Sequence, residues 1–249
     1  MKAQVKKIRL DRLLLDRGLA QSRERAQALV IAGKVLVNGQ KIEKSGTAVD
    51  PASEIRLLGD DLKYVSRGGV KLKHALQYWS IEVKERVCLD VGASTGGFTD
   101  CLLQHGAARV IAVDTGQGQI AFKLRQDPRV RLLENTNSRY LTREQLGETV
   151  DLVAIDVSFI SATLVLPAVI ASAFPEKRGE LIVLVKPQFE VGREHVGKGG
   201  IVRDPDQQQR AVEKIRGAVG YVGAISIEVI DSPILGAEGN KEFLLYAKF

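Results

Sequence analysis

The stretch Val87-Cys88-Leu89-Asp90-Val91-Gly92-Ala93-Ser94-Thr95-Gly96-Gly97-Phe98 decides the fold that we expect for this chain of 249 residues. Its first five residues have the apolar character of a buried strand and run directly into a glycine-rich turn. The residues after the turn give a helix one apolar face, and residues 110–113 have the pattern of the next strand. A strand, a glycine turn, a helix and a second strand predict a parallel α/β sheet that binds a nucleotide-like ligand.

Two acids beside this turn indicate which ligand it takes. Asp90 stands just before the turn, where a carboxylate would repel a pyrophosphate but suits the cationic amine of a methionyl group. Asp114, at the end of the second strand, suits two ribose hydroxyls. A dinucleotide dehydrogenase is the alternative, but Ser94 occupies its second glycine position, so we favour S-adenosylmethionine over NAD. The expected cofactor-binding residues are Asp90, Gly92, Ser94, Gly96, Gly97, Phe98 and Asp114.

Charged residues follow two later strands. Further strands are expected at residues 152–155, 181–185, 225–230 and 242–246, and Asp156 and Lys186 directly follow the first two of them. Ligands of an open α/β sheet bind outside the carboxyl ends of its parallel strands, so both side chains are expected in the site. A lysine after five apolar residues is unusual, because lysine is seldom buried without a function. Lys71 lies on a helix that is expected before the first strand.

The first quarter of the chain carries nearly all of the excess positive charge. Residues 1–60 hold 12 Lys and Arg against 7 Asp and Glu, whereas residues 61–249 hold 24 against 23. Two short helices, the second capped by Ser22, are expected to lead into a small sheet with a hairpin at Asn38-Gly39. A basic module on a near-neutral body is typical of a polyanion-binding appendage. The expected RNA-binding residues, on the polar sides of the helices, are Arg9, Arg12, Arg23, Arg25 and Lys34.

Composition excludes several other classes. Cys88 and Cys101 lie in apolar surroundings and are expected to be buried reduced thiols, and no Cys/His cluster predicts a metal site. The N-terminus has no apolar targeting segment, and the longest apolar stretch, residues 164–174, is short and interrupted by proline. A cytoplasmic protein without a membrane segment is therefore expected.

Residues 1–60 resemble the RNA-binding domain first described in the small-subunit ribosomal protein S-four. The resemblance rests on Arg9-Leu10-Asp11-Arg12-Leu13-Leu14, Ser22-Arg23-Glu24-Arg25-Ala26 and Gly33-Lys34-Val35-Leu36-Val37-Asn38-Gly39. It implies binding to structured RNA, where arginine and lysine on a rigid helix pair meet phosphates.

The rest of the chain resembles the TlyA, or haemolysin A, family of rRNA 2′-O-ribose methyltransferases, which have an FtsJ-like catalytic domain. The segments that carry this resemblance are Tyr64–Leu72, Leu89–Asp100, Asp156–Ser161, Leu184–Glu190 and Gly239–Phe243. It implies a Rossmann-like class I methyltransferase sheet of seven mostly parallel strands at residues 67–249, after a linker at 61–66 and a small α+β RNA-binding domain at 1–60. The family's Lys-Asp-Lys-Glu tetrad corresponds to Lys71, Asp156, Lys186 and Glu242. Glu242 fits the family's Gly-Asn-x-Glu pattern, whereas Glu238 is interpreted as a turn carboxylate.

The chemistry of a ribose hydroxyl agrees with this tetrad. The hydroxyl is a poor nucleophile until a base within about 3 Å takes its proton. We expect Lys186 to be that base, Asp156 to orient it, and Lys71 and Glu242 to position the ribose without a metal. The glycine-rich residues 190–204 are expected to form a mobile loop near the substrate that orders on RNA.

The resemblance implies cytidine targets in ribosomal RNA or ribosomal subunits, with no DNA partner, and leaves the subunit and the oligomeric state open. A non-catalytic RNA-binding or ribosome-assembly factor is the main alternative, because the basic module would serve it equally well. A membrane-lytic haemolysin has no supporting sequence feature. A cytosine-carbon methyltransferase would need a cysteine at a strand end, where neither Cys88 nor Cys101 lies.

Overall fold

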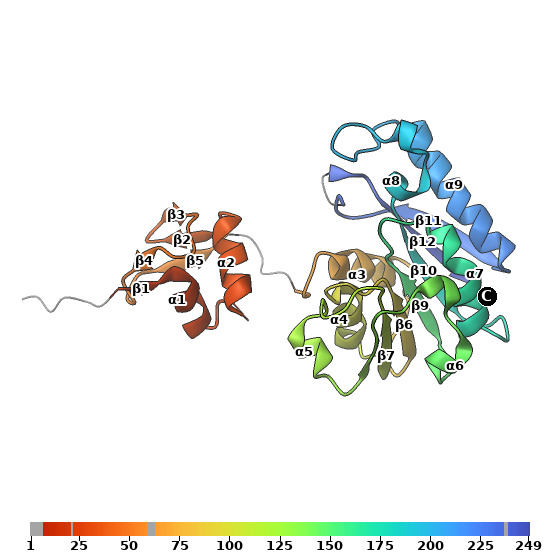
Figure 1. Cartoon of the computed structure of the whole chain (residues 1–249), viewed down its shortest axis with the longest axis horizontal. Coiled ribbons are helices and arrows are strands. Elements are labelled where there is room, and N and C mark those ends of the chain that lie inside the picture. The colour runs from red at the N-terminus through yellow and green to blue at the C-terminus, as the bar shows by residue number, and fades with distance from the viewer. Residues whose placement is uncertain (1–6, 21, 59–62, 237–238) are drawn as a thin grey trace, which may run out of the picture. The chain divides into compact units, whose positions relative to one another are not determined.

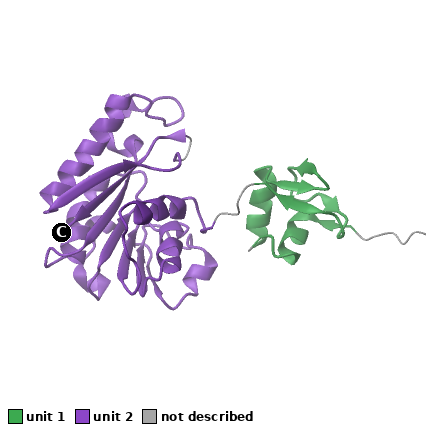
Figure 2. Cartoon of the chain, turned by 180° about the vertical axis from the view of Figure 1, so that it is seen from behind, with its two compact units in different colours: residues 1–61 green, residues 62–249 purple. Residues whose placement is uncertain are grey.

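The structure, a computed structural model, describes residues 7–20, 22–58, 63–236 and 239–249. The first residues of the expected linker, at 61–62, and Glu238 lie outside this described part. The chain divides into two compact units, residues 1–61 and 62–249 (Figure 2). Each unit has its own hydrophobic core, and each is described by itself below.

Unit 1 is the small α+β module that the sequence predicts. Ser22 caps α2 by accepting a hydrogen bond from the Arg25 backbone N–H at 3.2 Å. Asn38 and Gly39 both have positive φ, as a tight hairpin turn between β2 and β3 requires. Its elements in the described residues are β1 (Ile8–Arg9), α1 (Leu10–Asp16), α2 (Arg23–Ile31), β2 (Val35–Val37), β3 (Gln40–Ile42), β4 (Ala48–Val49) and β5 (Ile55–Leu57).

Two of the five expected RNA-binding residues do not lie on helices as expected. Arg9 belongs to β1, and Lys34 lies between α2 and β2. Arg9 pairs with the buried carboxylate of Asp11 in α1, at 2.8 Å between Nη2 and Oδ2. Arg23 of α2 also pairs with this carboxylate, at 3.3 Å, so Asp11 ties β1, α1 and α2 together. These hydrogen bonds, chiefly from Arg9, hold the pKa of Asp11 well below its usual range.

Unit 2 contains, within its described residues, one sheet of seven strands in the order β11-β12-β10-β9-β6-β7-β8 (Figure 1). The five strands from β10 to β8 pair in parallel, whereas β12 pairs antiparallel with both β10 and β11. This confirms the expected mostly parallel sheet. The strands are β6 (Val87–Val91), β7 (Arg109–Val113), β8 (Val130–Leu133), β9 (Leu152–Ile155), β10 (Glu180–Val185), β11 (Ser226–Asp231) and β12 (Phe243–Lys248).

Helices cover both faces of this sheet (Figure 1). Side chains alternate between faces along each strand. Leu89 and Val91 of β6 therefore belong to the core cluster that includes α7 and α9 residues, while Cys88 belongs to the cluster on the α3 and α4 side. The apolar strand runs expected from the sequence follow from burial on both faces. The helices are α3 (Gly68–Tyr78), α4 (Gly97–Gln104), α5 (Phe122–Arg125), α6 (Arg143–Leu146), α7 (Leu166–Ala173), α8 (Pro187–Glu190) and α9 (Pro205–Tyr221), with 3-10 turns η1 (Ser138–Tyr140), η2 (Ala162–Leu164) and η3 (Arg193–His195).

The structure departs from the sequence pattern at β8 and at the start of β12. The pattern does not pick out β8, because Arg131 interrupts a short strand at the edge of the sheet. Glu242 precedes β12 instead of starting it. None of the helices in the described part of the chain has the length and apolar character needed to cross a membrane.

Candidate active site

Two adjoining cavities open at the carboxyl edge of the parallel strands in unit 2. The first has a volume of about 560 Å³ and the second about 500 Å³. Both are lined by the glycine turn after β6 and by the segment after β9. The residues that line both are Gly92, Ser94, Asp156, Ser158 and Phe159.

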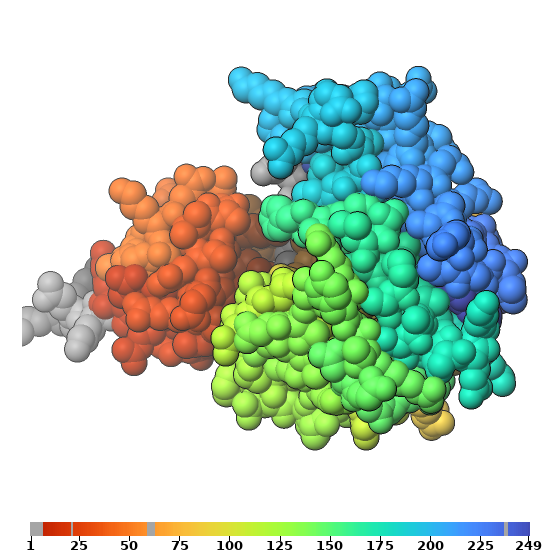
Figure 3. Space-filling view, turned by 45° about the vertical axis from the view of Figure 1, so that its right-hand side comes forward, coloured from red at the N-terminus to blue at the C-terminus, as the bar shows by residue number. Residues whose placement is uncertain are grey.

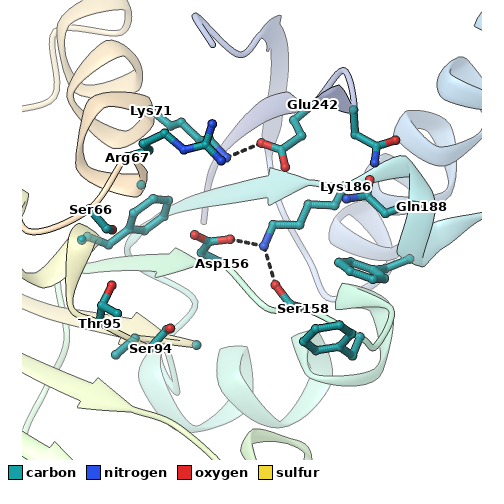
Figure 4. A pocket seen from close by; sticks show the side chains of 18 of the residues that line it. Ser66, Arg67, Lys71, Ser94, Thr95, Asp156, Ser158, Lys186, Gln188 and Glu242 are labelled. Atoms are coloured by element: carbon teal, nitrogen blue, oxygen red, sulfur yellow. Dashed lines mark hydrogen bonds and ion pairs between the residues drawn. The ribbon is translucent and has the colours of Figure 1, made fainter. Parts of the chain in front are cut away.

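The first cavity brings the four tetrad residues together (Figure 4). Asp156 follows β9 and Lys186 follows β10, and these neighbouring strands run parallel, so both side chains emerge at the same edge. Lys71 comes from the first turns of α3. Glu242 precedes β12, and because β12 runs antiparallel its beginning lies at the edge where the parallel strands end. The tetrad therefore comes from four segments that only the sheet topology joins.

Lys186 is held between two oxygens from the segment after β9. Its Nζ lies 2.6 Å from Asp156 Oδ1, and it donates a hydrogen bond to Ser158 Oγ at 2.7 Å (Figure 4). The side chains of Lys186 and Asp156 are 12% and 21% exposed, so the pair lies at the cavity wall, partly shielded from solvent. This geometry directs the amine of Lys186 into the cavity and leaves it accessible to a second reactant.

The other two tetrad residues form a more deeply buried ion pair. Lys71 Nζ donates a hydrogen bond to Glu242 Oε2, and the two side chains are 9% and 2% exposed (Figure 4). A buried pair of this kind keeps both side chains in one orientation, because neither charge can leave its partner without a large desolvation cost.

The carboxylate of Asp90 is fully buried at the base of the first cavity. Its Oδ2 accepts hydrogen bonds from the backbone N–H and the hydroxyl of Thr99, at 2.9 and 2.6 Å, and its Oδ1 has no hydrogen-bond partner among the residues that the structure describes. Burial raises the pKa of the Asp90 carboxyl to about 7, against the two bonds from Thr99, which favour the charged form. Buried polar atoms are normally hydrogen-bonded, so the unpartnered oxygen of Asp90 is suited to receive a hydrogen bond from a cationic group of a ligand.

Asp114 lies in the second cavity, where its two oxygens already organise the backbone. It accepts hydrogen bonds from the N–H of Ser94 and of Gly116, each at 2.7 Å. The second cavity is also lined by Gln119, Asn137 and Ser138, which are polar groups suited to a nucleoside.

Six of the seven expected cofactor residues line one or both of the cavities. Asp90, Gly97 and Phe98 line the first cavity, Asp114 lines the second, and Gly92 and Ser94 line both. Gly96 lines neither of these cavities. It has a φ of +94° at the N-terminal cap of α4, and a side chain there would overlap Leu124, so its role is to allow the turn.

Several cavity residues were not among the candidates from the sequence. Ser158 contacts Lys186, and Phe159 is 89% exposed at the mouth of both cavities with a φ of +68°. The ring of Phe159 lies 5.4 Å from that of Phe189. Each of these residues stands within three positions of a tetrad residue, and that proximity is the signal that could have identified them. Further residues of the first cavity that were not candidates include Ser66, Arg67, Gln188 and Asn240.

The glycine-rich loop at residues 190–204 reaches the first cavity through Val196 and Gly200. Figure 3 shows this segment, in cyan and light blue, projecting from the surface of unit 2. Asn240 fastens it: its Nδ2 donates to the Gly200 carbonyl oxygen at 2.8 Å, and its Oδ1 accepts from the Val202 N–H at 3.0 Å. That the loop at residues 190–204 becomes ordered when RNA binds stays a prediction.

Other chemical groups in the described residues do not offer a competing site. Burial raises the pKa of both cysteine thiols to about 12, and both are free and buried, as the sequence predicts. Among the residues that the structure describes, no group of three or more His, Cys, Asp or Glu side chains is arranged to hold a metal.

Comparisons with known proteins agree with the two units. Residues 64–249 match the FtsJ-like methyltransferase family and residues 8–55 match the S4 domain. The chain is 46% identical over 244 residues to the "16S/23S rRNA (cytidine-2'-O)-methyltransferase TlyA" of Mycobacterium tuberculosis, covering 98% of this chain and 90% of the relative. It is 39% identical over 242 residues to "Hemolysin A" of Brachyspira hyodysenteriae, covering 96% and 99%.

A solved structure of a protein named as a hemolysin, from Streptococcus thermophilus, superposes with a TM-score of 0.74 at 42% identity, over 98% of this chain and 89% of that one. The chain belongs to the FtsJ-like methyltransferase family, in the branch of TlyA and hemolysin A proteins that carry an S4 domain before the catalytic unit.

Proposed function

We propose that this protein transfers a methyl group from S-adenosylmethionine to a ribose 2′-hydroxyl in ribosomal RNA, with cytidine as the target nucleoside. The observation that carries the proposal is the Lys186–Asp156 pair, which lies where two cavities of suitable size adjoin. The cytidine target is taken from the name of the mycobacterial relative, which covers both 16S and 23S rRNA.

Residues of both cavities would hold the cofactor. Asp114 would accept hydrogen bonds from ribose hydroxyls in the second cavity, and Asp90 would face the methionyl amine through its unpartnered oxygen. Gly92, Ser94, Gly97 and Phe98 would line the path between them. When bound, S-adenosylmethionine supplies an electrophilic methyl group that requires a deprotonated hydroxyl as acceptor.

Lys186 is the proposed base for that hydroxyl. Its Nζ is ion-paired with Asp156 and donates a hydrogen bond to Ser158, which aims the amine toward the cavity. Asp156 also offsets the charge that Lys186 gains with the proton. The Lys71–Glu242 pair would position the ribose from the opposite wall. Holding the hydroxyl beside its base supplies much of the rate.

The part of the site around Phe159 and Phe189 suits an RNA nucleotide whose base is unstacked from the RNA helix. Phe159 presents an exposed aromatic ring beside Phe189, a surface on which an unstacked base can lie. A DNA strand lacks the 2′-hydroxyl, so the proposed chemistry selects RNA. The S4 unit would bring structured RNA through Arg9, Arg12, Arg23, Arg25 and Lys34, in the cytoplasm where ribosomes are found.

The test is methyl transfer from labelled cofactor to purified ribosomal subunits, with the modified nucleotides mapped. Wild-type protein is expected to methylate ribose, and Lys186→Ala to reduce kcat on the order of 100- to 10,000-fold with cofactor affinity unchanged. Lys248→Ala, an exposed lysine at the far end of β12, is the matched control and should retain full activity. Near-normal turnover by Lys186→Ala would exclude it as the base.

A non-catalytic assembly factor is the competing function. Such a factor would bind subunits through the basic unit and leave them unmethylated. Binding without transfer, under conditions where the mycobacterial relative is active, would favour it over the enzyme.

A further inference from the structure

A buried carboxylate outside the tetrad joins the two segments that carry Asp156 and Lys186. Glu190 is the last residue of α8 and is 7% exposed. It lines neither of the two cavities. A carboxylate is seldom buried unless its oxygens are satisfied, so the partners of Glu190 indicate what it holds in place.

Both carboxylate oxygens of Glu190 accept hydrogen bonds from the segment after β9. The backbone N–H of Ala162 donates to Oε1 at 2.8 Å, and the hydroxyl of Ser161 donates to Oε2. Ala162 is the first residue of η2, and a backbone N–H at the start of a helical turn has no acceptor within the turn itself. Glu190 therefore ties the end of the 157–162 segment to α8, which directly follows Lys186.

A third element completes the arrangement. Lys214 of α9 lies 3.2 Å from Glu190 Oε2 through its Nζ, and it donates to the Glu190 backbone carbonyl oxygen at 2.7 Å. The ammonium group compensates the buried carboxylate and fixes the end of α8 against α9. The loops after β9 and β10 and helix α9 thus meet at one side chain.

The segment that Glu190 ties down needs such support. Between Asp156 and Ser161 it carries Phe159, an exposed aromatic residue with a φ of +68°. A non-glycine residue in this conformation persists only where the surrounding structure holds it, at a cost of about 1 kcal/mol or more. The same segment supplies Ser158, which accepts a hydrogen bond from Lys186.

We infer that Glu190 is a positioning residue for methyl transfer, which holds the loop of Asp156 and Ser158 where both side chains contact the amine of Lys186. The inference rests on the function proposed above. It assigns Glu190 no contact with cofactor or RNA, and it makes Ser161 and Lys214 its supports.

The test compares Glu190→Ala, Glu190→Gln and Ser161→Ala with Glu180→Ala. Glu180 is a matched control, because it is an ion-paired carboxylate at the other end of β10, bonded to Arg86 and Tyr246. Glu190→Ala should reduce kcat on the order of 10- to 100-fold, with KM for cofactor and for RNA within about twofold of wild type. Glu190→Gln keeps an oxygen for the Ala162 N–H and should recover most of that loss, and Ser161→Ala should show a smaller one. Glu180→Ala should keep the wild-type kcat.

Amide hydrogen exchange provides a readout that does not depend on activity. Exchange at residues 157–163 should rise in Glu190→Ala and stay at the wild-type level in Glu180→Ala. Unchanged exchange there in Glu190→Ala, or an equal loss of kcat in Glu190→Ala and Glu180→Ala, overturns the inference. If the two variants show the expected exchange pattern but the wild-type protein methylates no RNA, the proposed function is overturned, whereas the structural role of Glu190 in holding residues 157–162 is retained.

Discussion

Lys71 and Glu242 form an ion pair in the interior of unit 2 although 171 residues separate them along the chain. The pair joins the first helix of the unit to the start of its last strand. Two charges with side chains 9% and 2% exposed are held in place by each other, since neither is well solvated. Their placement at the cavity edge is thus fixed before any ligand binds.

This pair predicts a non-additive effect on stability. Glu242→Leu should lower the free energy of unfolding by about 3–5 kcal/mol, because Lys71 then becomes a buried charge without compensation. The double variant Lys71→Met, Glu242→Leu should recover most of that loss and remain inactive in methyl transfer. Urea unfolding of both variants measures the coupling. Equal destabilisation of the single and double variants would show that the two charges do not depend on each other.

The raised pKa of Asp90 leads us to expect that the free energy of unfolding depends on pH. Its folded-state pKa of about 7 lies above the ordinary value of 3.8, so the folded protein binds an extra proton between these values. The contribution of Asp90 to the free energy of unfolding should therefore fall as pH rises across this window and level off above it. Asp90→Asn should remove this slope, as urea unfolding at a series of pH values would show.

Cofactor binding should respond to the same titration in the opposite sense. The methionyl amine requires the charged carboxylate, so affinity for S-adenosylmethionine should increase as pH rises through about 7. Calorimetry on wild type and Asp90→Asn checks this expectation. An increase of equal size in the variant would place the titrating group elsewhere.

At Gly92 we expect a single added methyl group to displace a tetrad residue. A Cβ at this position would lie 2.6 Å from the backbone carbonyl oxygen of Asp156, and its φ is +86°. Gly92→Ala should therefore displace Asp156, reduce kcat on the order of 100-fold, and destabilise the protein by more than conformational strain alone. Gly118→Ala isolates that strain, since Gly118 has a φ of +73° with nothing within 4 Å of an added Cβ, and should lose about 1–2 kcal/mol. Similar kcat values in the two variants would argue against the contact.

In unit 1 we expect different effects from removing an exposed arginine and from removing the buried carboxylate that pairs with two other arginines. Arg12 is 75% exposed and forms a surface ion pair with Asp16. Arg12→Ala should therefore weaken RNA binding and reduce the slope of the logarithm of the binding constant against the logarithm of salt concentration by about 1. The free energy of unfolding should stay unchanged. Asp11→Ala should instead destabilise the unit, because Arg9 and Arg23 lose their shared buried partner. RNA binding at several salt concentrations, with thermal unfolding alongside, separates the two effects. A loss of stability in Arg12→Ala would contradict its assignment to the surface.

The sequence predicted those features that depend on local patterns. The buried strands β6, β9 and β10 appear as apolar runs because both faces of the sheet are covered. β8 was not predicted, because this edge strand is buried less completely and contains Arg131. Ser158 and Glu190 were not singled out, since nothing in their local sequence shows that they contact Lys186 or Ala162.

The amino-acid sequence by itself determined the glycine turn, the strand ends that carry Asp156 and Lys186, and the basic first unit, because each follows from residue type and spacing within a short segment. Only the tertiary structure decided which charges pair. The antiparallel direction of β12 brings Glu242 to the edge where the parallel strands end, next to Lys71 rather than Lys186. Such pairing depends on strand order and direction, which are set by packing across the whole sheet and leave no local mark in the sequence.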